Sequence, residues 1–225
     1  MNALTHPSPN HGARRGGARP DLIVLHYTAM PTAEAALARL CDPKAEVSAH
    51  YLIRKDGQLC HLVDESRRAW HAGAGAWGDV TDVNSRSIGI ELANTGAQPF
   101  PEPQMAALEG VLASVMRRWA VRPDRVIGHS DMAPGRKTDP GPRFDWRRLA
   151  RQGLSVWPKP GAPGDGDLVA DLRRFGYPDA PPDMLLAAFR LRFRPWATGP
   201  ATAADRAQAY DLARRFPVDR ASATS

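Results

Sequence analysis

The apolar run LIVL at residues 22–25, followed at once by His26, sets the architecture that the rest of the chain must fit. Four apolar residues without a polar interruption are typical of a strand buried on both faces of a sheet. Two more strands are predicted at SIGIEL, residues 87–92, and at Val126-Ile127, which runs into His129. Between these strands, apolar residues recur at the spacing of a helix rather than of a strand.

Capping residues and apolar spacing indicate where the helices lie. Thr32 can cap a first helix and Asp145 a late, short one. Apolar residues that recur at spacings of three and four predict an amphipathic helix over 103–120. Residues 50–63 are predicted to form a hairpin, because Asp56-Gly57 supplies a turn with positive φ angles. Strands that alternate with helices predict an α/β fold.

Shifts in composition divide the chain into five segments. Residues 1–20 are polar and are predicted to form a flexible N-terminal arm, before an α/β domain over 21–153. Residues 154–166 have the proline and glycine content of a linker. Residues 167–218 hold three short helical patterns, which predict a small all-α three-helix module, and 219–225 form a tail.

The composition is that of a globular protein and excludes several other classes. Of the 225 residues 43% are hydrophobic, yet no apolar run approaches the ~18 residues that span a bilayer, so no transmembrane segment is expected. The first 20 residues contain no apolar stretch of the kind a secretory signal needs. Two cysteines, Cys41 and Cys60, exclude a disulfide scaffold and suit a reducing compartment. These features predict a cytoplasmic protein.

The net charge of +6 favours an anionic partner such as nucleic acid, a membrane surface or an acidic polymer. Basic residues are dense between Arg136 and Arg151, which a solvated surface would also explain. No recognised nucleic-acid-binding motif is present. We therefore expect no nucleic-acid partner.

Three residues of catalytic type stand at the ends of the predicted strands. His26 and His129 each follow a short strand directly, and Glu91 lies near the end of SIGIEL. In α/β sheets the carboxyl ends of the strands are where ligand sites form. A carboxylate between apolar neighbours is costly to bury unless it has a partner or a task. The two imidazoles and the carboxylate can therefore converge on one end of the sheet.

A catalytic zinc ion would explain this convergence, because it takes three protein ligands and leaves one position for water. The chain has no HExxH motif, so the third ligand must come from elsewhere. Asp139 follows His129 by ten residues and can fold back beside it, which would bring Lys137 near the metal. The alternative is an ordinary loop salt bridge between Lys137 and Asp139.

Five motifs, in this order, resemble the zinc-dependent N-acetylmuramoyl-L-alanine amidases, which include AmpD-type enzymes and are related to phage amidase lysozymes and peptidoglycan recognition proteins. The motifs are LHYTA (25–29), SAHYLI (48–53), AWHAG (69–73), SIGIEL (87–92) and GHSDMAPGRKTDPG (128–141). The similarity covers roughly residues 21–150, and the last motif is long and specific.

The resemblance implies a central mixed β-sheet flanked by helices, with one Zn²⁺ per chain at the floor of a groove. It implies that His26, His129 and Asp139 are the zinc ligands, that Glu91 is the catalytic acid and base, and that Lys137 stabilises the oxyanion. The reaction implied is hydrolysis of the amide between N-acetylmuramic acid and the L-alanine of the stem peptide. A non-catalytic peptidoglycan-recognition module is the rival reading, but each expected position is filled.

Other residues are weaker candidates for binding a muropeptide or a peptidoglycan fragment. Trp70, His71 and Asn94 fall where the family lines its groove, although packing and loop hydrogen bonds would also explain them. Tyr51 is a further candidate, and Arg86 could attract the carboxylates of the stem peptide.

The C-terminal stretch 171–212 is similar to the three-helix peptidoglycan-binding-like module of some cell-wall amidases. Five of its aromatic residues are predicted to form the core of the module rather than a platform for glycan: Phe175, Tyr177, Phe189, Phe193 and Trp196. We expect a recycling enzyme for 1,6-anhydro muropeptides in the cytoplasm, with the module shaping or covering the groove. The alternative is a periplasmic enzyme that acts on polymeric peptidoglycan. No feature of the sequence indicates an oligomeric state.

Overall fold

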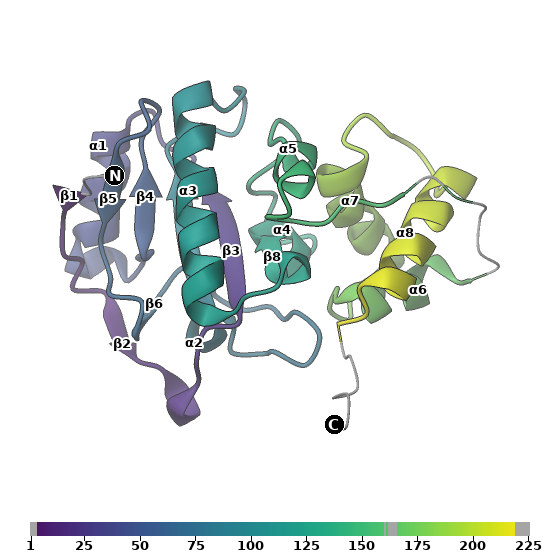
Figure 1. Cartoon of the computed structure of the whole chain (residues 1–225), viewed down its shortest axis with the longest axis horizontal. Helices are drawn as coiled ribbons and strands as arrows, with labels where there is room; N and C mark the ends of the chain where they lie inside the picture. The colour runs from purple at the N-terminus through teal and green to yellow at the C-terminus, as the bar shows by residue number, and fades with distance from the viewer. Residues whose placement is uncertain (1–3, 160, 162–165, 219–225) are drawn as a thin grey trace.

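The computed structural model describes residues 4–159, 161 and 166–218 of the chain (Figure 1). The strands are β1 (Leu4–Thr5), β2 (His11–Ala13), β3 (Leu22–Tyr27), β4 (Tyr51–Ile53), β5 (Leu59–His61), β6 (Arg67–Ala69), β7 (Ser87–Leu92) and β8 (Val126–Gly128). The α-helices are α1 (Ala33–Cys41), α2 (Val83–Arg86), α3 (Glu102–Trp119), α4 (His129–Met132), α5 (Trp146–Arg151), α6 (Leu168–Phe175), α7 (Pro182–Phe193) and α8 (Ala203–Arg215).

Within these described residues, six strands form one sheet in the order β1-β5-β4-β7-β3-β8. β3 lies between β7 and β8 and runs parallel to both, and β4 is parallel to β7. β5 pairs antiparallel with β4 through the hairpin that Asp56-Gly57 predicts. The sheet is therefore mixed and flanked by helices, as the sequence led us to expect. The register places His26 directly beside Glu91.

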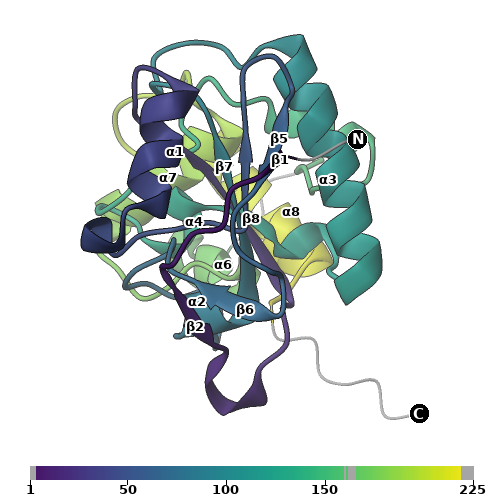
Figure 2. The ribbon, with the colours of Figure 1, turned by 90° about the vertical axis from the view of Figure 1, so that its left-hand side faces the viewer.

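Alternation along β3 sends its side chains into two separate cores. Ile23 and Leu25 pack in the core that includes α3, whereas Leu22 and Val24 pack on the opposite face. On that opposite face α1 covers the side of β4 through Leu52. Figure 2 shows α1 and α3 on opposite sides of the strands. The fully apolar run at 22–25 is thus explained by burial on both faces.

The capping residues that the sequence singles out perform that role. The Thr32 hydroxyl accepts a hydrogen bond from the Ala35 amide at the start of α1. The Asp145 carboxylate accepts one from the Arg148 amide at the start of α5. Each bond satisfies one of the amides that the first turn of a helix leaves without an intrahelical partner.

The three C-terminal helices share a hydrophobic core with the sheet. Leu172 of α6, Phe189 of α7 and Leu212 of α8 belong to the same buried cluster as Leu22 and Val24 of β3. The helices lie together at one end of the molecule (Figure 1). The segment expected to be a linker begins inside this packing, because Leu154 and Val156 are buried. Four of the five aromatic residues expected in the core are buried in this cluster: Phe175, Tyr177, Phe189 and Phe193. The expectation was wrong for Trp196, which follows α7 and is 70% exposed.

The described part of the expected N-terminal arm, residues 4–20, is built into the fold rather than free. β1 pairs with β5, and β2 pairs antiparallel with β6. The Asn10 amide donates to the carbonyls of Asp42 and Val47 at 2.8 Å each. The Arg14 guanidinium donates to the Ser85 carbonyl at 2.7 Å. Hydrogen bonds to backbone, which hydropathy does not reveal, hold this segment in place. Residues 1–3 lie outside the described part.

None of the helices in the described ranges combines the length and the apolar character needed to cross a bilayer. Cys41 and Cys60 are both free thiols.

Two aromatic residues near the end of α7 test whether the C-terminal helices and the sheet unfold together. Phe189→Ala should lower the free energy of unfolding by about 3–5 kcal/mol, because it empties a fully buried site. Trp196→Ala is the matched control, since Trp196 is 70% exposed; it should change stability by less than about 0.5 kcal/mol. Urea unfolding followed by circular dichroism and tryptophan fluorescence should give coincident transitions. Two separated transitions in the parent protein would contradict a shared core.

Candidate metal centre

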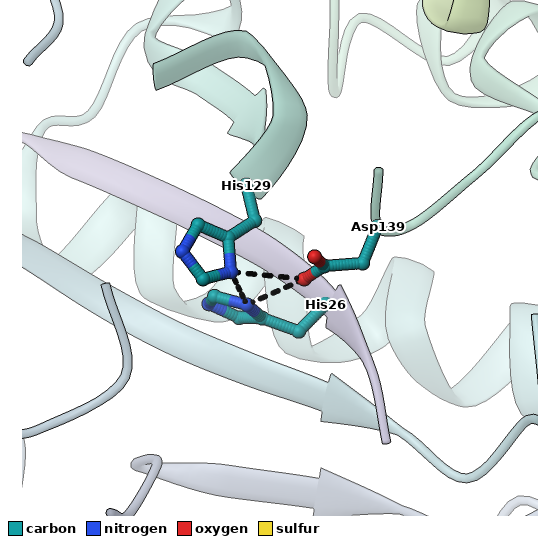
Figure 3. A group of neighbouring side chains, drawn as sticks. All are labelled: His26, His129 and Asp139. Atoms are coloured by element: carbon teal, nitrogen blue, oxygen red, sulfur yellow. Dashed lines mark hydrogen bonds and ion pairs between the residues drawn. The ribbon is translucent and has the colours of Figure 1, made fainter. Parts of the chain in front are cut away.

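Three side chains from three segments meet at one point (Figure 3). His26 Nδ1 lies 2.9 Å from His129 Nδ1 and 2.8 Å from Asp139 Oδ2. His129 Nδ1 lies 3.1 Å from the same carboxylate oxygen. All three residues are buried. The structure therefore brings together the three residues that the sequence suggests as metal ligands.

The topology explains why these residues converge. His26 lies near the carboxyl end of β3, and His129 directly follows the adjacent parallel strand β8. Parallel neighbours end at the same edge of a sheet, so the two rings start side by side. Asp139 is returned to this edge by the loop after α4, where the Ser130 amide donates to the Asp139 carbonyl at 2.9 Å.

Hydrogen-bond partners assign the proton of His129 to its outer nitrogen. His129 Nε2 lies 2.8 Å from the carbonyl oxygen of Ala72. A carbonyl can only accept, so Nε2 carries the hydrogen of the neutral ring. The nitrogen that faces His26 and Asp139, Nδ1, then has a free lone pair.

A longer chain of hydrogen bonds assigns the proton of His26. The Ser87 hydroxyl donates to the Val83 carbonyl at 2.6 Å, so the oxygen of Ser87 must accept from His71 Nε2 at 3.2 Å. The Nδ1 of neutral His71 can then only accept, and His26 Nε2 donates to it at 3.0 Å. This leaves His26 Nδ1 as a lone pair, again directed into the cluster.

Three acceptor atoms with no hydrogen between them therefore lie within 3.1 Å of one another. The lone pairs of these three atoms repel one another unless a cation lies between them. Tetrahedral zinc with bonds of ~2.0–2.1 Å separates its ligand atoms by roughly 3.3 Å, close to the spacing seen here. Two imidazoles and one carboxylate also form a donor set that zinc accepts. The residues present fit a metal ion.

Gly89 in the SIGIEL strand makes the supporting position of His71 possible. A Cβ atom at residue 89 would lie 2.4 Å from the His71 ring. Only glycine leaves room for the ring to reach both His26 and Ser87. The glycine that interrupts an otherwise apolar strand thus serves the metal ligands indirectly.

The charge states suit cation binding. Burial, reinforced by His129, lowers the pKa of His26 to about 4, so its ring is neutral at physiological pH. Burial also lowers the pKa of His71 well below its ordinary value. Burial alone would raise the pKa of Asp139, but the close approach of the His129 and His26 rings holds it well below its usual range. Metal ligands must be free of protons, and this pattern leaves them so.

Glu91 lies beside the cluster and lines the cleft as a half-buried residue with one covered carboxylate oxygen. Its Oε2 atom is buried with no hydrogen-bond partner among the described residues. Burial, and next the charge of Asp139, raise the pKa of Glu91 to about 8, against the opposing effect of Lys137. A carboxyl group of raised pKa can both take and return a proton near neutral pH.

A cleft of about 360 Å³ opens over these groups. Glu91 and Lys137 line it beside the three ligands, together with Trp70 and His71. The exposed Lys137 places a mobile cation in the same cleft as the Glu91 carboxylate. The structure thus gathers the candidate acid, base and cationic groups in one place.

Three other candidates, Tyr51, Arg86 and Asn94, do not line this cleft. The Tyr51 hydroxyl donates to Glu65 at 2.5 Å, on the face of β4 that turns away from Leu52 and Glu91. Arg86 pairs with Asp21 near the opposite ends of the strands.

Asn94 is buried and organises the loop that follows β7. Its amide donates to the Gln98 carbonyl at 3.2 Å, and its side-chain oxygen accepts from the Gly96 amide at 2.8 Å. These contacts shape the backbone next to the cleft, and none of them points Asn94 into it.

Two further arginines, Arg39 and Arg136, also line the cleft. Arg39 comes from α1. Arg136 donates to the Ala72 carbonyl at 2.8 Å and to the carbonyl of Ala74, which ties the loop after α4 to the segment that supports His129. In the sequence, Arg136 lies within the run GRKTD of the last amidase motif.

Comparison with known proteins agrees with this geometry. Residues 16–142 match the model of the family described as N-acetylmuramoyl-L-alanine amidase. The chain belongs to this amidase family. The match contains all three converging ligands together with Glu91 and Lys137.

Individual amidases resemble the chain over most of its length. The N-acetylmuramoyl-L-alanine amidase AmiD of Escherichia coli is 37% identical over 89% of this chain and 85% of its own. The 1,6-anhydro-N-acetylmuramyl-L-alanine amidase AmpD of Enterobacter cloacae is 38% identical over 66% of this chain and 89% of its own.

Two solved structures extend the likeness to the C-terminal helices. The complex of E. coli AmiD with anhydro-N-acetylmuramic acid-L-Ala-D-γ-Glu-L-Lys has a TM-score of 0.81 at 34% identity and covers 92% of this chain and 93% of that one. AmpDh3 of Pseudomonas aeruginosa with anhydromuramic pentapeptide has a TM-score of 0.80 at 31% identity and covers 90% of this chain and 94% of that one.

His71 provides a test of the proton assignments. His71→Ala should weaken metal binding about 10–100-fold, the usual effect of removing a residue that orients a ligand. His71→Gln, which keeps an acceptor oxygen, should recover part of the loss. His61→Ala is the control, because His61 stacks near Tyr51 and lines a different cavity. Competition with a chromophoric chelator measures the Zn²⁺ affinity, and an unchanged value in His71→Ala would contradict the assignment for His26.

Proposed function

We propose that this amidase uses zinc to hydrolyse the amide between 1,6-anhydro-N-acetylmuramic acid and the L-alanine of the stem peptide. The observation that carries the proposal is the meeting of three proton-free ligand atoms beside an unpartnered, buried carboxylate oxygen in one cleft. The substrate follows from the relatives, since the matching AmpD proteins carry the 1,6-anhydro substrate in their names and AmiD was solved with such a compound.

His26, His129 and Asp139 would hold the zinc ion. When bound, zinc acts as a Lewis acid that polarises the scissile carbonyl and lowers the pKa of a coordinated water. The hydrogen bonds of His26 to His71 and of His129 to Ala72 keep both Nδ1 atoms directed at the ion.

Glu91 would carry the proton from the attacking water to the leaving amine. Its buried Oε2 has no competing donor among the described residues, so it is free to accept the proton. Its raised pKa means that the protonated form is not strongly acidic and can persist until the amine leaves. The same oxygen then returns the proton to the alanine nitrogen as the C–N bond breaks.

Lys137 would stabilise the negative charge that develops on the carbonyl oxygen. Lys137 lies on the loop between the two candidate ligands His129 and Asp139 and lines the same cleft. A cation that interacts with charge present only in the transition state raises the rate and does not tighten substrate binding.

We place the reaction in the cytoplasm, as part of peptidoglycan recycling. The free thiols of Cys41 and Cys60 suit a reducing compartment, and anhydro muropeptides are soluble fragments that need no polymer-binding surface. Cell fractionation tests this placement. Recovery of the protein from the periplasm would favour the alternative, an enzyme that acts on polymeric peptidoglycan.

A substitution at Glu91 distinguishes a role in proton transfer from a role in binding. Glu91→Gln should keep zinc and substrate binding but lower kcat about 10²–10⁴-fold, because the amide cannot take up the proton. The exposed Glu46 supplies the control, and Glu46→Gln should leave kcat unchanged. Steady-state kinetics with metal analysis measures both. A raised KM with kcat intact would show that Glu91 binds substrate instead.

Lys137→Ala should lower kcat about 10²–10³-fold, the effect of removing one group that stabilises an oxyanion. Lys44→Ala changes an exposed lysine at the far end of α1 and should have no effect. If the loss in Lys137→Ala appeared in KM alone, Lys137 would be a substrate-binding residue.

Product analysis tests the reaction as a whole. The purified protein should release the tripeptide from anhydro-N-acetylmuramic acid-L-Ala-D-γ-Glu-L-Lys, more rapidly than it digests intact sacculi. A chelator should abolish both reactions, and added Zn²⁺ should restore them. Mass spectrometry identifies the bond that is cut. Full activity of a metal-free preparation would remove zinc from the proposal, and faster digestion of sacculi would replace the substrate.

A further inference from the structure

An arginine of the C-terminal helices reaches out of its own helix bundle to the strand and turn that carry His129. Arg192 of α7 is 2% exposed. Its Nη1 donates to Asp131 Oδ2 at 2.7 Å, and its Nη2 donates to the Val126 carbonyl at 3.0 Å. The guanidinium carbon also lies 4.2 Å from the centre of the Trp146 ring.

Asp131 accepts the hydrogen bond from Arg192 and also binds the backbone next to His129. It is fully buried, and its Oδ2 accepts the Gly128 amide at 2.8 Å. Its Oδ1 accepts the Tyr177 hydroxyl, from the segment after α6, at 2.7 Å. A buried carboxylate is tolerated only with such partners. Two of its three donors come from the C-terminal helices, and the third borders His129.

This carboxylate helps to fix the backbone at His129, together with the backbone hydrogen bonds of Ser130 to Asp139 and of Ala133 to His129. α4 is four residues long, a single turn that begins at His129. β8 is an edge strand of the described sheet and pairs on one side with β3. Arg192 satisfies the Val126 carbonyl of β8, while Asp131 fixes the amide of Gly128. The residues before and after His129 are thus held by one ion pair.

We propose that Arg192 is a positioning residue for the metal ligand His129, and that the C-terminal helices are therefore a working part of the metal centre. The inference rests on the proposed function, since it requires a metal ion at the site. It differs from a separable module that only binds the cell wall or covers the groove. Loss of the Arg192 contacts should let the turn at His129 shift and weaken metal binding.

A second buried ion pair supplies a matched control within the same helix. Arg190 of α7 donates to both carboxylate oxygens of Asp205, at 3.1 and 2.7 Å. Arg190 is 7% exposed, and its other partners are the carbonyls of Gly199 and Pro200. This pair ties α7 to α8, and none of the hydrogen bonds of Arg190 among the described residues reaches α4. Its loss should destabilise the helices and leave His129 in place.

The experiment measures the Zn²⁺ affinity and the melting temperature of the full chain carrying Arg192→Met, Arg192→Lys or Arg190→Met. Methionine keeps an unbranched apolar stem at residue 192 but donates no hydrogen bond. Arg192→Met should raise the Kd for Zn²⁺ about tenfold, at the low end of the effect for residues that support a metal ligand. Arg192→Lys should lie closer to the parent. Arg190→Met should lower the melting temperature and leave the Kd unchanged.

The absorption spectrum of the Co²⁺-loaded protein gives a second readout that stability alone does not move. The bands should change in Arg192→Met and stay as in the parent in Arg190→Met. Equal Kd values and spectra in both variants, or equal losses in both, would overturn the proposal. If Arg192→Met does not fold, Tyr177→Phe, which removes the other donor to Asp131, should raise the Kd several-fold, and an unchanged Kd would overturn it. A parent chain that binds no Zn²⁺ would instead refute the proposed function.

Discussion

Two imidazole nitrogens and one carboxylate oxygen face one another with no hydrogen to share, and this acceptor cluster governs the rest of the site. The protons of His26 and His129 are used elsewhere, on His71 and on the carbonyl of Ala72. A cation is the group that turns the mutual repulsion of the three atoms into attraction. Glu91 lies half-buried beside this point, where its carboxyl group can exchange a proton with a reacting molecule.

The cluster depends on hydrogen bonds that extend well beyond its ligands. His26 is held by a chain that ends at the backbone of α2, and His129 by the loop at Ala72 and by the ion pair of Asp131 with Arg192. These supports come from segments inside and after the part that the family match covers. The C-terminal helices and one face of the sheet share a hydrophobic core. The candidate metal centre lies at the carboxyl ends of β3 and β8.

Sequence patterns predicted the parts of the fold that local physics controls. The apolar run at 22–25, the cap at Thr32 and the turn at Asp56-Gly57 are short-range signals, and each appears in the structure. The placement of His26 and His129 on adjacent parallel strands was also within reach, because both directly follow short apolar runs.

Contacts that depend on register or on distant partners could not be predicted in this way. Tyr51 turns away from the cleft because β4 pairs with β7 so that Leu52, and not Tyr51, lies beside Glu91. No local pattern fixes that register. His71 supports His26 through a contact across 45 residues, and Arg192 reaches Asp131 across 61. Such contacts exist only after the chain has folded.

The arrangement of the metal ligands can be tested by crystallography at the zinc absorption edge. Crystals of the zinc-loaded protein should show one anomalous difference peak, bonded to Nδ1 of His26, Nδ1 of His129 and a carboxylate oxygen of Asp139. Bond lengths of about 2.0–2.2 Å are expected for this donor set. A peak bonded to His71, a peak on the Nε2 side of either ligand, or zinc bound only outside the cleft would contradict the arrangement on which the site is built.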